Sequence, residues 1–207
     1  GDPEPFRPDP SRFGGLDGYR LFFWVNSWDK VRGNLRVQWQ EGPIFDRGLG
    51  VPVEVGESWS GDLSLRFFPT PRLNGELGVR HESIDRATDG SRYSSATIPR
   101  LRAQYQFTRA LFLRGIFEYS AQEREAPRDP ASGARLAAGC DTECQLREGS
   151  EANDIHVEGL LAYEPSPGTV FFLGYSRDME EPDPFRFRDV EPRSEGFFVK
   201  ISYRLRF

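Results

Sequence analysis

Apolar and polar residues alternate along most of this chain, so that every second side chain is apolar. A period of two residues is that of a β-strand with one apolar face. The last segment has the clearest pattern, because its odd positions are all apolar: Phe197, Val199, Ile201, Tyr203, Leu205 and Phe207. The alternation predicts about nine strands, at residues 19–27, 31–40, 58–68, 72–82, 97–107, 111–121, 154–163, 169–177 and 195–207.

The predicted connections alternate between short turns and long loops. The long loops are expected at residues 41–57, 83–96, 122–153 and 178–194. In an up-and-down antiparallel sheet all the short turns then lie at one end, an asymmetry that is typical of outer-membrane barrels with short periplasmic turns. Residues 1–18 are rich in proline, and we expect them to form an extended segment or loop ahead of a barrel domain at 19–207.

Alternation alone fits two kinds of protein. A soluble β-barrel or sandwich that binds a ligand buries its apolar face, whereas a membrane barrel turns that face to lipid. Long strands, aromatic residues at strand ends and charged residues at strand centres favour lipid, because such charges would be costly to bury in a dry core. We therefore expect the polar face to line a wet lumen, with Arg102, Gln104, Arg114, Glu118, His156, Glu158, Lys200 and Arg204.

The pattern thus predicts an all-β protein, an antiparallel up-and-down transmembrane β-barrel of the bacterial outer membrane. Such a protein acts as a pore, or as the anchor or scaffold of a larger surface protein. Nine is an odd number, whereas bacterial single-chain barrels have an even number of strands with both ends in the periplasm. We therefore expect this chain to be part of a larger barrel.

The expected partners follow from this prediction. They are the lipid bilayer with its lipopolysaccharide, the barrel-assembly machinery, and further outer-membrane or surface subunits. The alternating apolar residues from Phe197 to Phe207 are typical of the C-terminal signal that this machinery reads. The net charge of −5 argues against a nucleic-acid partner, because nucleic-acid binding usually needs a basic balance.

Candidate chemistry is sparse. The chain has no recognisable catalytic, phosphate-binding or metalloprotease motif, and we expect no cofactor. We expect His156 and Glu158 to be a pair in the wall of the lumen and the protein not to be an enzyme. The two residues could also share a proton or hold a metal, and an outer-membrane barrel hydrolase is the third alternative. The acidic stretch at 178–183 lacks the spacing of a calcium loop and is expected to be solvated.

The two cysteines, Cys140 and Cys144, lie close together in a polar stretch that we expect to be an extracellular loop. A local disulfide is favoured, with two free thiols and a metal site as the alternatives.

Two stretches resemble a known family: IPRLRAQYQFT at 98–108 with LFLR at 111–114, and LLAYEPSPGTVFFLGY at 160–175. Both are similar to the C-terminal β-barrel of uncharacterised bacterial outer-membrane proteins that carry a carbohydrate-binding-module-like N-terminal domain. The resemblance covers roughly residues 58–207 and implies an outer-membrane barrel. Residues 1–18, ahead of the first expected strand, do not resemble such a domain, and we therefore expect none of its glycan activity in this stretch.

Overall fold

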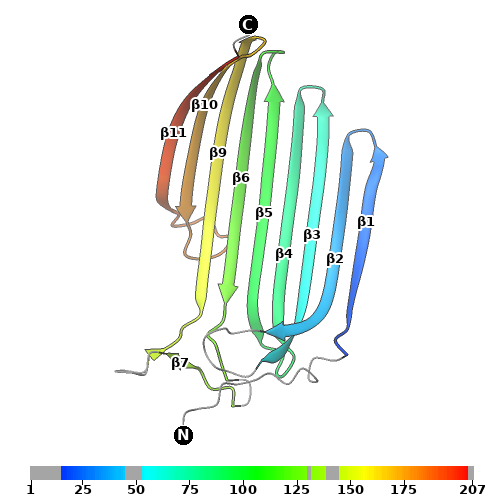
Figure 1. Ribbon diagram of the computed structural model, residues 1–207, viewed down its shortest axis with the longest axis vertical. Helices are drawn as coiled ribbons and strands as arrows, with labels where there is room; N and C mark the ends of the chain where they lie inside the picture. Colours follow the sequence, from blue (N-terminus) through cyan, green and yellow to red (C-terminus); the bar gives the residue numbers. More distant parts are fainter. Residues whose placement is uncertain (1–14, 45–52, 130–131, 139–144, 205–207) are drawn as a thin grey trace.

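The computed structural model describes residues 15–44, 53–129, 132–138 and 145–204. Nine strands form a single sheet (Figure 1). In spatial order they are β1 (Gly18–Trp28), β2 (Val31–Ile44), β3 (Glu54–Thr70), β4 (Leu73–Arg86), β5 (Arg92–Gln106), β6 (Leu111–Arg124), β9 (Ser150–Ser166), β10 (Thr169–Glu180) and β11 (Glu191–Tyr203). The described part contains no helix that is long and apolar enough to cross a membrane.

Every pair of neighbouring strands in this sheet is antiparallel, and the spatial order follows the chain. The short turns all lie at the end of the sheet where β11 finishes, and the longer connections lie at the other end (Figure 1). The predicted all-β, up-and-down antiparallel architecture with nine strands is therefore confirmed.

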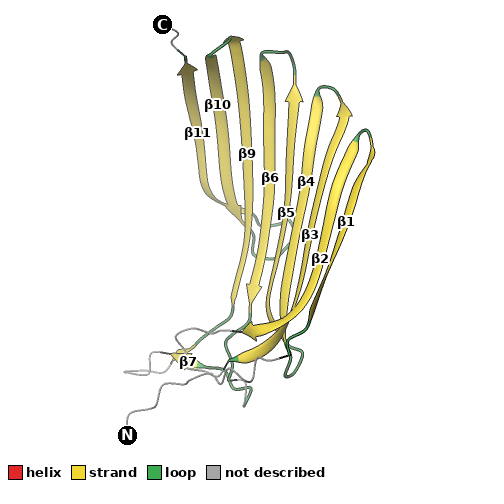
Figure 2. Cartoon of the chain, turned by 45° about the vertical axis from the view of Figure 1, so that its right-hand side comes forward, coloured by secondary structure: helices red, strands yellow, loops and turns green. Residues whose placement is uncertain are grey.

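The sheet is an open, curved wall (Figure 2). β1 pairs only with β2, and β11 pairs only with β10, so the described strands do not close into a barrel. Eight successive antiparallel ladders separate the two edge strands, and β1 and β11 therefore run in the same direction.

The strands reach further into the predicted long loops than the sequence pattern indicates. β3 begins at Glu54, β5 at Arg92, β9 at Ser150 and β11 at Glu191, and the expected loops 41–57, 83–96, 122–153 and 178–194 are too long by these extensions. The hydrogen-bonded ladder continues where the apolar alternation has already stopped. A short ribbon of β7 (Ala137–Ala138) and β8 (Gln145–Leu146) was also missed, because two-residue strands carry no periodicity.

Over its central stretch, each ladder of the large sheet pairs odd-numbered residues with odd-numbered residues. Examples are Tyr19 opposite Trp39, Leu65 opposite Leu77 and Leu113 opposite Leu161. Because side chains alternate between the two faces of a strand, the odd positions of these central stretches share one face of the sheet. The apolar halves of the nine alternating segments therefore merge into one continuous surface.

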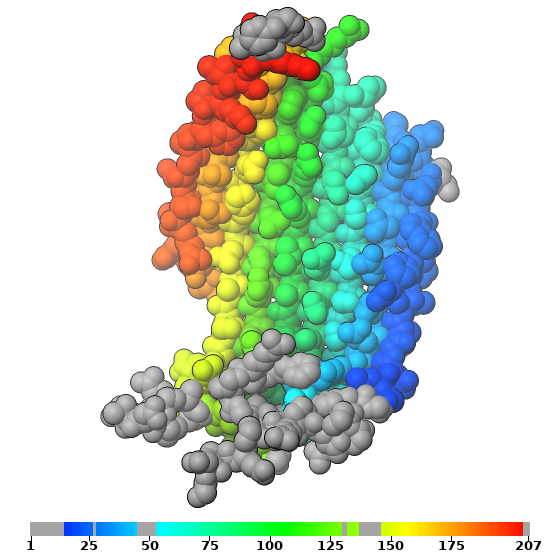
Figure 3. All heavy atoms as spheres, in the orientation of Figure 1, coloured from blue at the N-terminus to red at the C-terminus, as the bar shows by residue number. Residues whose placement is uncertain are grey.

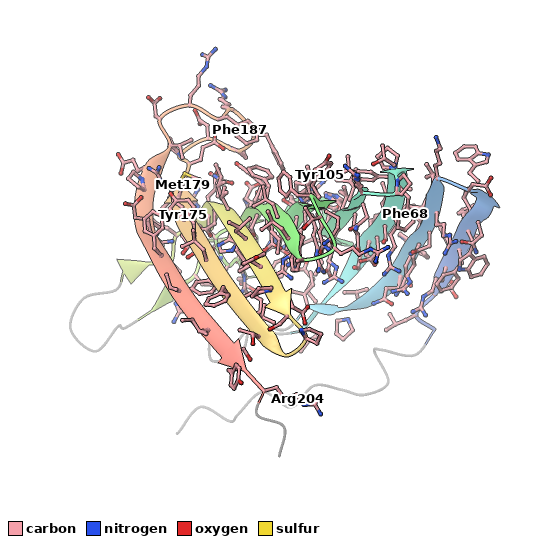
Figure 4. The ribbon with its side chains drawn as sticks, turned by 90° about the horizontal axis from the view of Figure 1, so that it is seen from above. Phe68, Tyr105, Tyr175, Met179, Phe187 and Arg204 are labelled. Carbon is pink, nitrogen blue, oxygen red and sulfur yellow. The ribbon has the colours of Figure 1, made fainter. Side chains whose placement is uncertain are left out.

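The even-numbered face is the concave one. An open hollow of about 890 Å³ near the long-loop end is lined mainly by even-numbered residues of six strands, from Gln40 on β2 to Ala152 on β9. Figure 3 looks onto this concave side, and from above the strands form an arc (Figure 4). The apolar odd-numbered face is the convex, outer surface of the arc.

Two glycines receive aromatic rings from the neighbouring strand. Phe67 lies over Gly75 on the convex face, and Phe198 lies over Gly174 on the concave face, so that a Cβ atom at either glycine would collide with the ring. The ring occupies the space that the glycine leaves and covers its backbone. These pairs fix the local packing between β3 and β4 and between β10 and β11.

We predict that Gly75→Val lowers the free energy of unfolding by about 1–3 kcal/mol, because Phe67 must leave its position over the strand. Urea titration in detergent or lipid measures the change. Gly61→Val is the matched control on the same face, since an added Cβ there would meet only the Arg36 carbonyl oxygen, at 4.0 Å. Equal losses at the two sites would contradict the packing role of Phe67.

Candidate functional site

The polar residues expected to line a lumen share the concave face. Arg102, Gln104, Arg114, Glu118, His156, Glu158 and Lys200 are all even-numbered strand residues, and the ladders bring their faces together. Arg204 follows β11, where its backbone N–H donates to the Gly168 carbonyl oxygen at 2.7 Å. We call this side of the sheet the concave polar face.

Ion pairs cross between neighbouring strands on the β2–β4 part of this face. Asp62 on β3 accepts a hydrogen bond from Arg80 Nε at 2.9 Å, and Arg36 Nη1 lies 3.8 Å from its other oxygen. Arg66 and Glu76 form a second pair at 3.7 Å. One carboxylate thus serves two guanidinium groups, and positive and negative charges alternate from strand to strand.

The alternation of charge continues across β5, β6 and β9. Arg100 Nε lies 3.4 Å from Glu118, and Arg114 Nη2 lies 3.5 Å from Glu158. These two pairs use three of the predicted lumen residues. Arg100 was not among them, and the partner of Glu118 was therefore missing from the sequence interpretation.

The sequence analysis offered Glu158 as the partner of His156, but in the structure His156 pairs with Asp178. Its Nδ1 atom lies 2.6 Å from Asp178 on the next strand, and the Ser194 hydroxyl donates to the other Asp178 oxygen at 2.7 Å. Residues two apart on one strand are about 7 Å apart, whereas cross-strand neighbours are about 5 Å apart. Asp178 was expected in a loop, but β10 extends to Glu180 and places it opposite His156.

A hollow of about 450 Å³ opens beside this group. Its lining includes Glu118, Ser120 and Arg193, and Arg193 bridges Asp154 at 3.1 Å and Glu180 at 3.5 Å. The Ser194 hydroxyl donates to Asp178 and not to His156, so these three residues form a histidine–aspartate–serine chain rather than a serine–histidine pair.

The larger hollow, of about 890 Å³, is lined near the long-loop end by an aromatic ring and by charges of both signs, Glu82, Glu123 and Arg124. Tyr93 contributes to its lining, and the guanidinium groups of Arg86 and Arg124 lie 5.2 Å and 5.1 Å from the Tyr93 ring centroid. Arg86 is buried and pairs with Glu54 at 3.2 Å. This pair stiffens the polar ends of β3 and β4, beyond the apolar alternation.

Only part of the expected assembly signal, and neither cysteine, falls within the residues that the structure describes. Phe197, Val199, Ile201 and Tyr203 of the expected assembly signal lie on the convex face of edge strand β11, while Leu205 and Phe207 lie outside the described residues. Cys140 and Cys144 also lie outside them, so their pairing stays a prediction. Among the residues that the structure describes, no group of three or more histidine, cysteine, aspartate or glutamate side chains could hold a metal ion.

Comparison of the chain with protein-family models, curated proteins and solved structures finds no match.

We predict weak, salt-dependent coupling between the charges of the concave polar face. In a double-mutant cycle of Arg114→Gln and Glu158→Gln, the coupling free energy should be about 0.5–1 kcal/mol, because both side chains remain partly exposed to water. The more exposed pair Arg66 and Glu76 is the matched comparison and should give a smaller value. A coupling of about 3 kcal/mol or more would instead indicate a dry environment.

Proposed function

We propose that this sheet is part of the wall of an outer-membrane β-barrel, with its convex face against lipid and its concave face toward water. The observation that carries the proposal is the single continuous apolar surface on the outside of the curve. A soluble barrel or sandwich places its apolar face inside, against itself or a second sheet. Here the inside of the curve bears the charges.

The extent of apolar exposure supports the same reading. Among the described residues only a few apolar side chains are buried: Ile44, Tyr93, Tyr119, Ile155, Leu160 and Ala162. In contrast, Leu21 and Leu173 on the convex face are 51% and 50% exposed. Contiguous apolar surface of this kind is unfavourable in water but not in a bilayer, which supports lipid as the medium around the convex face.

Aromatic residues border the apolar surface at both ends. Tyr19, Trp39 and Trp59 cluster at the long-loop end, with Tyr19 stacked on Trp39 at 5.3 Å. At the short-turn end Tyr105 packs against Phe107 at 4.9 Å. Eight residues separate Trp59 from Phe67 on β3, a rise of about 26 Å along the strand and about 20 Å across a membrane at the usual tilt. This is close to the roughly 25 Å apolar band of outer-membrane barrels.

Closure of such a barrel needs further strands. β1 and β11 run in the same direction, so pairing between them would be parallel, and an all-antiparallel barrel requires an odd number of additional strands between these edges. We propose that these strands come from the same polypeptide or from a partner subunit. The short turns would then face the periplasm, where the barrel-assembly machinery reads the alternating residues of β11.

Whether the assembled barrel is a pore or an anchor depends on its lumen. We predict that an open lumen gives conductance in planar bilayers with weak ion selectivity, because charges of both signs line the concave polar face. Replacing Arg102 and Arg114 by glutamine together should then shift the selectivity toward cations. No conductance from the complete barrel would identify the protein as an anchor or scaffold whose lumen is filled by its own side chains.

The wall itself is tested by charge substitution on the two faces. We predict that Leu113→Arg costs about 2–4 kcal/mol of folding free energy in lipid, because Leu113 would lie near the bilayer midplane. Gln104→Arg, on the neighbouring strand but on the concave face, should change stability little. Ile201→Arg and Ser202→Arg form a second such pair on β11. Similar costs on both faces, or a stable monomer without detergent, would overturn the proposal.

A further inference from the structure

The connection between β10 and β11, residues 181–190, folds back over the convex face. Phe187 lies on the outer side of the arc of strands (Figure 4). Phe185 stacks on Tyr119 of β6 with ring centroids 4.4 Å apart, and Phe187 meets the same ring edge-on at 5.5 Å. Tyr119 is fully buried as a result. The connection is thus a packed element on the apolar side of the wall.

Backbone geometry holds this connection in a defined shape. Phe185, Phe187 and Asp189 have φ values of 60°, 52° and 55°, and Arg186 and Arg188 between them are not left-handed. The Glu181 carboxylate lies at the start of this connection and accepts hydrogen bonds from the Tyr119 hydroxyl at 2.6 Å and the Arg188 N–H at 3.2 Å.

The sequence predicted that the acidic stretch at 178–183 is solvated. This is wrong for Glu181, which is buried. Glu181 is 2% exposed, and its own N–H donates to the Asn153 carbonyl oxygen at 2.9 Å. The Phe185 N–H donates to the Tyr119 hydroxyl at 2.8 Å. These bonds fix the connection to β6 and β9 before any ligand arrives.

The fixed connection presents an alternating aromatic and cationic edge. Phe185 and Phe187 are 45% and 55% exposed in spite of their contacts with Tyr119, and Arg186 and Arg188 are exposed beside them. Arg186 pairs with Asp183 at 3.4 Å, but both side chains are exposed and such a pair is weak. The guanidinium groups are therefore accessible to an external anion.

We propose that residues 181–190 form a lipid-binding segment that binds phosphate-bearing lipid headgroups in the leaflet at the long-loop end. Phe185 and Phe187 would enter the edge of the hydrocarbon layer, and Arg186 and Arg188 would bind headgroup phosphates. Guanidinium groups match phosphate oxygens in a two-pronged geometry, and aromatic rings are enriched at the membrane interface. The inference rests on the proposed membrane wall, because only then does the convex face meet headgroups.

The first test measures the depth of the connection in the membrane. In the variant Phe187→Trp, lipids with brominated acyl chains should quench the fluorescence of the added tryptophan. The parent chain, with its four native tryptophans, gives the background. Val199→Trp on the convex face of β11 is the control for the wall. If only the fluorescence of Val199→Trp is quenched, the proposed lipid-binding segment is wrong but the proposed membrane wall is supported. If neither variant is quenched, both proposals are wrong.

The second test measures headgroup binding. The full chain is extracted from vesicles of phosphatidylcholine and phosphatidic acid, and the phosphatidic acid that stays bound to it is measured. In the double variant Arg186→Gln with Arg188→Gln this amount should fall by roughly fivefold for each guanidinium removed. The control is Arg72→Gln with Arg109→Gln, which makes the same change of charge in two short turns at the opposite end. Equal retention by the two double variants would overturn the assignment of phosphate to Arg186 and Arg188.

Discussion

The register of strand pairing places odd-numbered residues opposite odd-numbered ones and even opposite even. The composition of both faces of the sheet depends on this register. Through eight successive ladders, odd residues oppose odd residues over the central stretch of every strand. A shift of one residue in a single ladder would exchange the faces for all strands beyond it. It would bring Arg114 and Glu118, for example, to the apolar side. The turn lengths and the apolar pattern therefore have to agree at every hairpin.

The two faces are stabilised by different interactions. On the concave face each strand offers charges to the next, as Asp62 does to Arg36 and Arg80, and these pairs can exchange with water at little cost. On the convex face few contacts bury the side chains. In the proposed membrane setting lipid would supply most of their desolvation, and the sheet would be a wall between two solvents with the bilayer as a structural component.

The fold was largely predictable from sequence because the alternation is local and long. Its nine segments, their order and their shared face follow from a period of two residues. The polar ends of β5 and β9 were not predictable, since neither Arg92 nor Ser150 has alternating apolar neighbours to mark it as strand. Cross-strand partners such as Asp178 for His156 depend on register, which a single segment does not encode.

The left-handed residues 185, 187 and 189 were unpredictable for a further reason. Phenylalanine rarely adopts a positive φ, so its side chain gives no sign of such a conformation. Tertiary contacts stabilise it: Phe185 stacks on Tyr119, Phe187 meets the same ring edge-on, and the N–H groups of Phe185 and Arg188 donate to the Tyr119 hydroxyl and the Glu181 carboxylate. Hydrogen bonds to a charged acceptor are stronger than neutral ones and can offset backbone strain.

The place of this connection follows from unequal strand lengths. β9 begins at Ser150 and pairs with β6 from there, whereas β10 ends at Glu180, opposite Asp154. The first residues of β9 therefore have a ladder on one side only. The Glu181 N–H donates to the Asn153 carbonyl oxygen where the next rung would lie, and the chain then turns outward over Tyr119. A longer β10 would complete the ladder but leave Tyr119 uncovered, so the early end of this strand is what brings the Phe185–Arg188 edge to the outer surface.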